Sequence, residues 1–474
     1  MQIGSAITRT TIACMQIYNT IERALVPLEP SVEGRVSIYV CGPTVQSEPH
    51  LGHGRSAVSF DVLRRYLEWL GNDVVFVRNV TDIDDKIIAM AENLGISTEE
   101  VARDAFGAFS AAYDRLGNLP PTIEPKATEH IPGMIALISE LIETGHAYES
   151  GGDVYFSVRS FDGYGRLSRH SIDDLRAGER VEPGDLKRDP LDFAMWKAAK
   201  PGEPQWDSPW GPGRPGWHIE CSAMATHYLG PAFDIHAGGS DLIFPHHENE
   251  IAQSEAPHGD VFAKYWMHNG MLNLRGEKMA KSTGHVVTLL DSLDRWDPVA
   301  VRLFYLRTHY RKPLDFSPEA LDDAEASLGR LRAFRRRAPE FVEDAPDTEV
   351  LDRFKGLMDN DLDVAGALAV VFDVVRNANA MIDAGDDAGP YVAAFDEMMT
   401  VLGLTDSEAE AEIDIAAIVD RLGVEATSID ALVAMRDQAR HDRDWGQADA
   451  IRDELASVGV VIEDTPDGAR WHRD

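Results

Sequence analysis

The sequence predicts an α/β fold: a Rossmann-like parallel-sheet domain with an insertion, followed by an α-helical domain and a small mixed C-terminal unit. Three observations predict it. Within residues 36–80 a buried strand, an amphipathic helix and a second apolar strand follow one another, which is typical of a βαβ unit. Strand and helix signals alternate again within 217–300, and helical spacing continues from 298 to about 420. The length of 474 residues fits about three domains.

Local signals place the boundaries of these parts. We expect a strand at 36–41, a helix from Arg55 to Leu70, and a strand at 73–80. Asp297 and Pro298 are expected to begin a later helix as its N-cap and first residue. The predicted divisions are 1–14, a possible disordered extension; 15–150, the first half of the sheet domain; 151–216, an irregular insertion rich in Pro, Gly and Trp; 217–300, the second half; 301–344, a helical connecting region; 345–420, a helical bundle; and 428–474, a charged helix with a short strand.

The composition is that of a globular protein, with 44% hydrophobic and 26% charged residues. No apolar run approaches the roughly 20 residues that a membrane helix needs. The three cysteines, Cys14, Cys41 and Cys221, are too few for a disulfide scaffold and fit a reducing compartment. We therefore expect a cytoplasmic location and no membrane partner.

The charge balance is strongly acidic, since 45 basic and 80 acidic residues give a net charge of −35. Taken alone, this charge argues against a nucleic-acid partner, because basic residues must neutralise phosphates. We interpret the excess as a surface adaptation to high salt, which predicts a loss of stability on desalting. Any contact with a nucleic acid then needs local clusters of basic residues. The candidates are Arg307, Arg311, Lys312, Arg330, Arg332, Arg335, Arg336 and Arg337. The alternative is that these residues only form a solvated helix face.

Two short motifs have the chemistry of a polyphosphate site. His50 and His53 lie where the first strand passes into a helix, and a helix N-terminus offers free N–H groups and a positive dipole end. Lys278 and Lys281 lie in a loop flanked by Gly and Ser, where a mobile cation pair can stabilise a leaving pyrophosphate. Each motif also has an ordinary explanation. The histidines can stand at the start of a helix without a role, and the lysines can belong to a solvated loop.

A third constellation has the residue types of a zinc site. Cys41 ends the first strand, Cys221 lies far downstream, and His246 and Glu250 share one face of a predicted helix that Pro245 opens. Two thiolates, an imidazole and a carboxylate suit Zn²⁺. Because cysteines so far apart have no diagnostic spacing, two buried apolar cysteines beside a salt-bridged helix remain the alternative. A metallohydrolase built on residues 246–248 is a rival that leaves the cysteines and lysines unexplained.

The order of the motifs resembles that of the cysteinyl-tRNA synthetase family, which belongs to the class I synthetases. The resemblance covers nearly the whole chain from Met15 onward. Ala280 stands where Ser is more usual and Gln46 where an aromatic residue is common, but both signature lysines are present. The matching segments are 39–45, 50–53, 77–86, 216–221, 238–241, 244–250 and 278–282, with further matches at 443–445 and 463–464.

The resemblance implies a role for each matching residue. It assigns catalysis to His50, His53, Lys278 and Lys281; ATP binding to Gly52, His236, Gly238, Asp241 and Lys281; amino-acid binding to Cys41, Thr81 and Trp217; zinc binding to Cys41, Cys221, His246 and Glu250; and tRNA binding to Arg440, Trp445, Asp449 and Asp464. Residues 301–344 become the tRNA stem-contact region, and 428–474 the anticodon-binding unit.

The implied reaction is the ATP-dependent activation of L-cysteine to cysteinyl-adenylate, followed by transfer to the 3′ end of tRNA(Cys). One Zn²⁺ per subunit selects the thiolate, Mg²⁺ accompanies ATP, and a monomer is expected. With four protein ligands, the substrate sulfur enters as a fifth ligand or displaces Glu250. Two rivals are a ligase that passes cysteine to an aminosugar and a non-catalytic, zinc-stabilised nucleotide-binding protein. Residues 345–474 argue against the first rival, and the intact signatures argue against the second.

Overall fold

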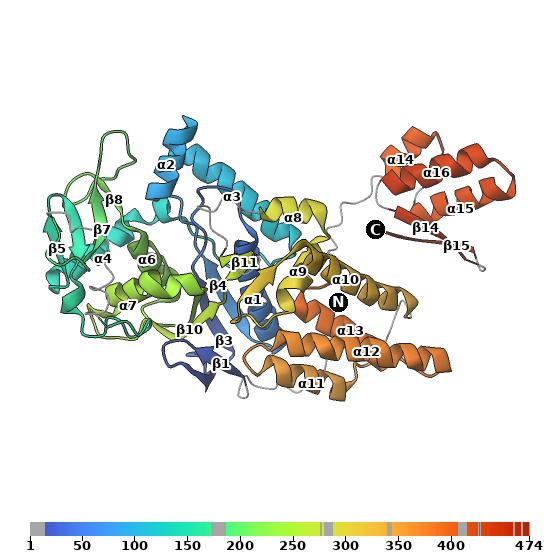
Figure 1. Cartoon of the computed structure of the whole chain (residues 1–474), viewed down its shortest axis with the longest axis horizontal. Coiled ribbons are helices and arrows are strands. Elements are labelled where there is room, and N and C mark those ends of the chain that lie inside the picture. Colours follow the sequence, from blue (N-terminus) through green and yellow to red (C-terminus); the bar gives the residue numbers. More distant parts are fainter. Residues whose placement is uncertain are drawn as a thin grey trace. The chain divides into compact units, whose positions relative to one another are not determined.

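The computed structural model describes residues 15–171, 186–274, 277–278, 288–338, 344–405, 415–424, 426, 428–457, 460–465 and 468–473. The chain divides into two compact units, Met1–Thr405 and Asp406–Asp474 (Figure 1). The proposed extension 1–14 and the signature residue Lys281 lie outside the described residues.

A four-stranded parallel sheet lies within the first unit, in the order β10-β9-β3-β4. Strand β3 (Arg35–Val40) pairs with both β4 (Asp73–Arg78) and β9 (Phe233–Gly239), and β9 pairs with β10 (Ala263–Asn269). The predicted parallel α/β sheet is therefore confirmed. Because β3 and β9 lie side by side, residues far apart in sequence meet at their carboxyl ends, where open parallel sheets bind ligands.

Helix α1 (Leu51–Trp69) connects β3 to β4 and packs against the sheet. The helix begins one turn earlier than predicted, because His50 acts as its N-cap. It ends beside Gly71, whose φ of +88° is the left-handed conformation that glycine adopts readily. Apolar residues that recur along α1 at helical spacing are buried, namely Val58, Val62, Leu63, Tyr66 and Leu67.

The insertion is more regular than predicted. An antiparallel sheet, in the order β5-β6-β7-β8, occupies much of the region that we expected to be irregular. Its strands have only three to six residues, and the register shifts between Val154 and Tyr155. The alternation of apolar and polar residues is therefore too short to recognise in the sequence. The strands are β5 (Ala147–Ser150), β6 (Asp153–Phe156), β7 (Phe193–Ala198) and β8 (Gly213–Pro215).

The remaining elements of the sheet region surround its edges. The helix predicted to open at Pro245 begins later, because a π-helical turn, Ile243–His247, precedes α7 (Glu248–Glu255). The others are β1 (Gln16–Asn19), β2 (Ala24–Pro27), α2 (Asp85–Leu94), α3 (Thr98–Arg115), α4 (Ile131–Glu143), α6 (Trp217–Leu229), β11 (Leu272–Leu274), β12 (Glu277–Lys278), α8 (Leu289–Arg295) and β13 (Leu314–Phe316), with short 3₁₀ turns at Ala127–Glu129, Val158–Ser160 and Ser240–Leu242.

A helical region completes the first unit. The prediction that Asp297 caps a helix is confirmed, since its Oδ1 accepts a hydrogen bond from the Val299 N–H at 2.8 Å. Helix α12 is long and apolar enough to cross a membrane by length and composition alone, a test that core helices also pass. It packs against α11 and α13. The helices are α9 (Pro298–Leu306), α10 (Pro318–Arg337), α11 (Thr348–Met358), α12 (Val364–Ala384) and α13 (Gly389–Leu402).

The second unit holds more structure than the single helix and strand that we expected. Within the described part of this unit, three helices pack around a small core of Ile418, Leu432, Ile451 and Leu455, and an antiparallel hairpin follows them. The elements are α14 (Ile415–Leu422), α15 (Ile429–His441), α16 (Trp445–Ser457), β14 (Val460–Thr465) and β15 (Gly468–Arg473).

A buried ion pair joins α1 to the helical region. The fully buried Arg302 of α9 pairs with Asp61 of α1 and donates to Asn118 Oδ1 at 3.0 Å. Burial opposes ionisation of Asp61, but Arg302 and Arg65 outweigh it and lower the pKa of this carboxyl. The pair therefore depends on an ionised Asp61.

Replacing Asp61 by Asn is expected to lower the free energy of unfolding by about 3–5 kcal/mol, because Arg302 stays buried without its counter-charge. Since the pKa of Asp61 is lowered on folding, its contribution is present above the ordinary carboxyl range near ~4 and is lost as the pH falls below that range. Urea unfolding at several pH values measures this. Asp104→Asn, in an exposed pair with Arg103, should cost less than about 0.5 kcal/mol, and equal losses for the two variants would contradict the prediction.

Candidate active site and metal centre

A cavity of about 330 Å³ lies at the carboxyl end of β3 and the N-terminus of α1. A Cβ on Gly42 would lie 1.6 Å from the carbonyl oxygen of Asn79, so only glycine fits this wall. Lys86 also lines the cavity, with its ammonium group 5.8 Å from the centroid of the Trp217 ring. Among the predicted site residues, those that line the cavity are Cys41, His50, Gly52, His53, Trp217 and Asp241.

His50 and His53 form a reciprocal cap at the start of α1. The Gly52 N–H donates to His50 Nδ1 at 3.1 Å, and the His50 N–H donates to His53 Nδ1 at 3.1 Å. The two rings stack with centroids 3.7 Å apart. Because both Nδ1 atoms accept backbone hydrogen bonds, each neutral ring carries its proton on Nε2 and can donate through that atom. The helix therefore begins with two donor rings at a cavity wall.

Cys41 also belongs to a cluster of possible metal ligands. One ligand atom from each of Cys41, Cys221, His246 and Glu250 lies within 4.8 Å of every other. The sulfur of Cys41 lies 3.6 Å from that of Cys221 and 3.4 Å from Glu250 Oε1, and His246 Nε2 lies 3.0 Å from the same oxygen. The structure thus brings together the four predicted ligands: Cys41 directly after β3, Cys221 on α6, His246 in the turn that leads into α7, and Glu250 on α7.

The chemistry of this cluster fits a divalent metal ion. Burial raises the pKa of the Cys41 thiol well above its usual value, and the neighbouring Cys221 and Glu250 raise it further. Burial lowers the pKa of His246 well below its usual value, which keeps its ring neutral. A nearby cation would favour the Cys41 thiolate, and a neutral imidazole is the form that binds metals. Sulfur, nitrogen and oxygen donors in this combination suit Zn²⁺.

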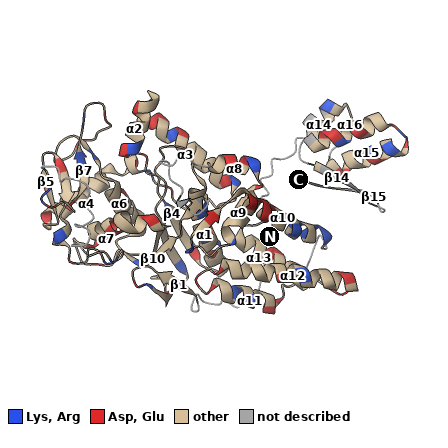
Figure 2. Ribbon diagram, viewed as in Figure 1, with Lys and Arg blue, Asp and Glu red and all other residues tan. Residues whose placement is uncertain are grey.

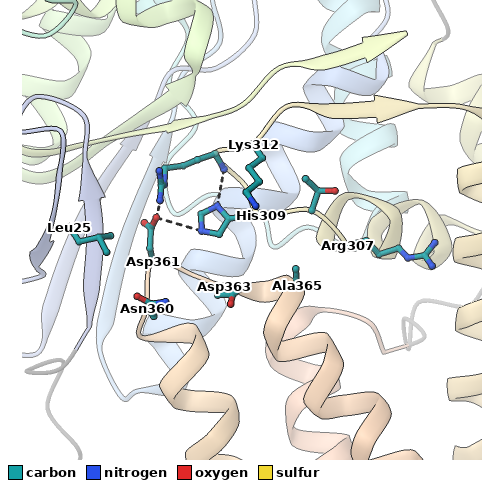
Figure 3. A pocket seen from close by; sticks show the side chains of 10 residues that line it. Leu25, Arg307, His309, Lys312, Asn360, Asp361, Asp363 and Ala365 are labelled. Carbon is teal, nitrogen blue, oxygen red and sulfur yellow. Dashed lines mark hydrogen bonds and ion pairs between the residues drawn. The ribbon is translucent and has the colours of Figure 1, made fainter. Parts of the chain in front are cut away.

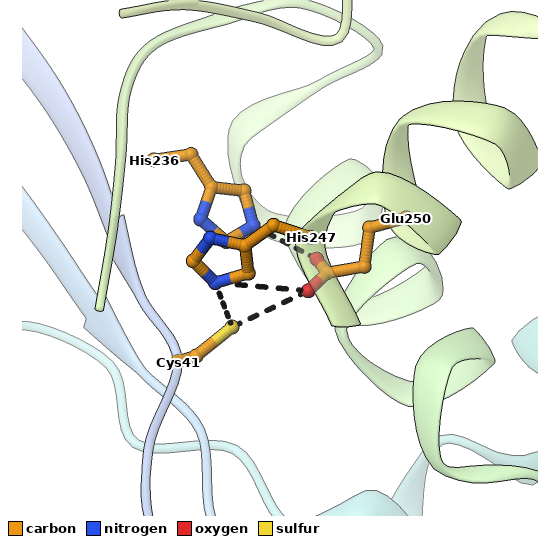
Figure 4. A group of neighbouring side chains, drawn as sticks. All are labelled: Cys41, His236, His247 and Glu250. Carbon is orange, nitrogen blue, oxygen red and sulfur yellow. Dashed lines mark hydrogen bonds and ion pairs between the residues drawn. The ribbon is translucent and has the colours of Figure 1, made fainter. Parts of the chain in front are cut away.

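Two further histidines join the cluster and make a second set with Cys41 and Glu250 (Figure 4). His236 Nε2 lies 2.8 Å from Glu250 Oε2, and His247 Nε2 lies 3.3 Å from the sulfur of Cys41. His236 is fully buried and does not line the cavity, in contrast to its predicted place beside the nucleotide. His247 was not among the predicted zinc ligands, although its position next to His246 was a usable signal.

Two other residues that were predicted to bind substrates lie outside the cavity lining. Thr81 is 2% exposed, and its hydroxyl donates to Glu220 Oε2 at 2.9 Å and accepts from Asn79 Nδ2 at 3.3 Å. The Oδ1 atom of Asn79 in turn accepts the Gly42 N–H at 2.8 Å, so Thr81 supports the cavity wall through Asn79. Gly238 leaves room for a neighbouring ring, because a Cβ there would lie 3.1 Å from His247.

The other predicted residues lie elsewhere. The backbone of Lys278 pairs with Asn273 in the β11–β12 hairpin, and Lys281 lies outside the described residues. All four predicted anticodon contacts belong to the second unit. Trp445 is 58% exposed at the start of α16, while Arg440 lies on α15, Asp449 on α16 and Asp464 on β14.

The predicted basic cluster divides into two parts. On α10 the arginines largely bind within the protein: Arg332 to Asp297 at 2.5 Å, Arg335 to Asp396 at 2.8 Å, and Arg337 to Asp383. Acidic residues also lie among the basic ones along the other helices (Figure 2). The α10 arginines therefore stay a weak candidate for nucleic-acid contact, whereas residues 307–312 line a hollow of their own.

The fold is that of the class I aminoacyl-tRNA synthetases. The methionyl-tRNA synthetase of Mycobacterium tuberculosis, in complex with methionyl-adenylate, superposes with a TM-score of 0.56 at 17% identity, covering 78% of this chain and 90% of that one. The LeuRS–tRNA–LeuAMS ternary complex of Agrobacterium radiobacter K84 gives a TM-score of 0.57 at 11% identity, covering 80% and 84%.

Sequence comparison identifies the family within this class. The model of the class I (C) tRNA synthetase catalytic domain matches residues 27–326, a DALR domain matches 353–406, and the cysteinyl-tRNA ligase anticodon-binding domain matches 426–471. The cysteine–tRNA ligase of Thioalkalivibrio sulfidiphilus is 50% identical over 97% of this chain and 100% of its own length. That of Halorhodospira halophila is 48% identical over 97% and 99%. The chain belongs to the family of cysteine–tRNA ligases.

Proposed function

We propose that the protein activates L-cysteine with ATP and transfers it to the 3′ end of tRNA(Cys) in the cytoplasm. The observation that carries this proposal is the position of Cys41. This residue lines the cavity beside the His50–His53 pair and also belongs to the cluster with Cys221, His246 and Glu250. A nucleotide site and a thiol-selective metal site thus share one wall.

Cys41, Cys221, His246 and Glu250 are the proposed ligands of one zinc ion. A bound Zn²⁺ would favour the thiolate of L-cysteine over the hydroxyl of serine, a distinction that an apolar pocket makes poorly. His236, through its contact with Glu250 Oε2, orients this carboxylate rather than the adenosine. His247 Nε2 lies 3.3 Å from the sulfur of Cys41, and in the tautomer that carries its proton on Nε2 it would donate to the thiolate and stabilise it.

The remaining cavity residues hold the ATP. His50 and His53 donate through Nε2 to its phosphates, which Mg²⁺ accompanies, and the N-terminus of α1 favours the same charge. Gly52 and Asp241 line the cavity and are proposed nucleotide contacts, and Gly238 is a further one. Lys278 and Lys281 are proposed to stabilise the leaving pyrophosphate. Trp217 closes the side on which the amino acid lies. The carboxylate of cysteine then attacks the α-phosphorus, and positioning supplies most of the rate.

The second unit is proposed to read the anticodon. Trp445 presents an exposed ring on which a base can stack. Arg440, Asp449 and Asp464 are proposed as the further contacts, and they belong to α15, α16 and β14. We propose that the enzyme acts as a monomer.

Two assays test this function. Cysteine-dependent exchange of pyrophosphate into ATP is expected, and it would be absent from a non-catalytic nucleotide-binding protein or a metallohydrolase. Charging of tRNA(Cys) then separates the proposed function from a ligase that transfers cysteine to an aminosugar. Exchange without charging would contradict the proposal.

A further inference from the structure

Lys86 lines the active-site cavity, yet neither signature motif nor the proposed zinc site includes it. It is the second residue of α2, and it is exposed. Within the residues that the structure describes, its ammonium group makes no hydrogen bond or ion pair, and it lies 5.8 Å from the centroid of the Trp217 ring. A cation without a carboxylate partner in a reaction cavity is available to an anionic group of a substrate.

Many other cations of this acidic chain are held by carboxylates. Arg311 pairs with Asp361 at 2.5 Å in a separate hollow of about 470 Å³ (Figure 3). Arg78 is the other lysine or arginine in the described lining of the active-site cavity, and it pairs with Glu124 at 2.7 Å. Lys86 is therefore the cation that this described lining leaves for a substrate.

The acidic residues that precede Lys86 do not neutralise it, because each has another partner. The contacts are Asp82 Oδ1 with the Thr128 N–H at 2.9 Å, Asp84 Oδ1 with the Lys86 backbone N–H at 2.9 Å, and Asp85 with Lys197 and with Arg214, both at 2.5 Å. The bond to Asp84 caps α2 and fixes the backbone that carries Lys86. The side chain is thus anchored at the cavity while its charge stays available.

The neighbours of Lys86 indicate which anion it meets. Trp217, over which the ammonium group lies, also stacks on His246 with ring centroids 4.2 Å apart. His246 is a proposed zinc ligand, so Trp217 lies between Lys86 and the group that is proposed to hold the substrate thiol. The His50–His53 pair instead stands at the N-terminus of α1, which favours phosphates. Lys86 therefore belongs to the amino-acid part of the cavity.

We propose that the ammonium group of Lys86 binds the carboxylate of L-cysteine, which makes Lys86 a further catalytic residue for the first step. This proposal rests on the proposed function and adds a substrate contact to it. The carboxylate must approach a triphosphate of like charge, and a fixed cation beside it reduces the repulsion. A carboxylate oxygen then bonds to the α-phosphorus, and pyrophosphate leaves with the electron pair of the broken bond. Lys86 keeps its proton throughout and forms no covalent bond.

Calorimetric binding of L-cysteine and of cysteamine to zinc-loaded Lys86→Gln enzyme tests this proposal. Cysteamine has the thiol and the amino group of cysteine but lacks the carboxylate. The affinity for L-cysteine should fall about tenfold, whereas the affinity for cysteamine should stay within about twofold, because only L-cysteine loses a charge-assisted hydrogen bond. In pyrophosphate exchange, KM for cysteine should rise and KM for ATP should not. Since the side chain is exposed and has no ion pair to lose, the fold should be kept.

Two further variants serve as controls. Lys86→Arg keeps the positive charge and should retain most of the affinity for L-cysteine. Lys126→Gln is the matched control, because Lys126 also lies over an aromatic ring, 5.3 Å from the centroid of Phe106, but does not line the cavity. Its affinity for both ligands should equal that of the wild-type enzyme.

The outcomes separate this proposal from the proposed function. Equal losses of affinity for L-cysteine and cysteamine in Lys86→Gln would overturn the proposal, because Lys86 would then act through Trp217 and not on the carboxylate. A raised KM for ATP with an unchanged affinity for L-cysteine would overturn it as well, since Lys86 would then contact phosphate. If Lys86→Gln binds L-cysteine as tightly as a wild-type enzyme with normal exchange, the proposal fails and the proposed function stands. A wild-type enzyme without cysteine-dependent exchange would overturn the proposed function, and this proposal with it.

Discussion

Cys221→Ser is expected to lose its bound zinc and to reduce cysteine-dependent pyrophosphate exchange by more than about 100-fold. Mutations of groups that only support metal ligands typically cost about 10–100-fold, and removal of a ligand should cost more. The serine hydroxyl is a poor metal ligand, but it nearly matches the volume of the buried thiol, which is 1% exposed. The fold should therefore survive. Metal content by elemental analysis and exchange assays at saturating cysteine measure the two effects.

Cys14→Ser is the matched control for this prediction. Cys14 is not one of the four proposed ligands, so zinc content and exchange should equal those of the wild-type enzyme. A Cys221→Ser enzyme that retained one zinc per chain together with full exchange activity would contradict the assignment of Cys221.

His53→Asn is expected to lower kcat for pyrophosphate exchange by about 10²–10³-fold, the usual cost of removing one hydrogen-bond donor from a developing charge. The amide oxygen of Asn can replace Nδ1, which accepts the His50 N–H at 3.1 Å, so the cap of α1 is kept. The Nε2 donor is lost. Because the zinc cluster is untouched, KM for cysteine should change little.

His53→Gln has the opposite effect on the two interactions, because it keeps a donor and loses the cap of α1. Its amide nitrogen can reach the position of Nε2, while the cap is lost at a cost of about 1 kcal/mol of stability. This variant should keep more activity and less stability than His53→Asn. Comparing kcat with urea unfolding for the two variants separates the two roles. The opposite ranking would show that His53 only caps the helix.

The sheet was predictable because strong local patterns mark it. The apolar runs of β3 and β4 and the spacing of Val58, Val62 and Leu63 on α1 show their periods within a few residues. The start of α1 was not predictable in the same way, because histidine is not among the residues that usually cap helices. The sheet of the insertion was missed because its strands are too short for their alternation to stand out.

The metal cluster shows a different limit. His246 and Glu250 share a face at helical spacing, but no local pattern relates either of them to Cys41 or Cys221. These residues meet because the end of β3, α6, and α7 with the turn before it converge, and only the resemblance to a family anticipated that. His236 was assigned to the nucleotide, yet burial places its ring against Glu250. Sequence spacing carries no information about which of several nearby histidines faces a cavity.

The role of the cluster in selecting a thiol can be measured directly by absorption spectroscopy of the cobalt-substituted enzyme. Co²⁺ reports its ligands through its d–d and thiolate charge-transfer bands. Adding L-cysteine is expected to change both sets of bands, because the substrate thiolate would add a sulfur donor to those of Cys41 and Cys221. L-Serine is expected to leave them unchanged. A spectrum indifferent to L-cysteine would contradict selection of the amino acid at this site.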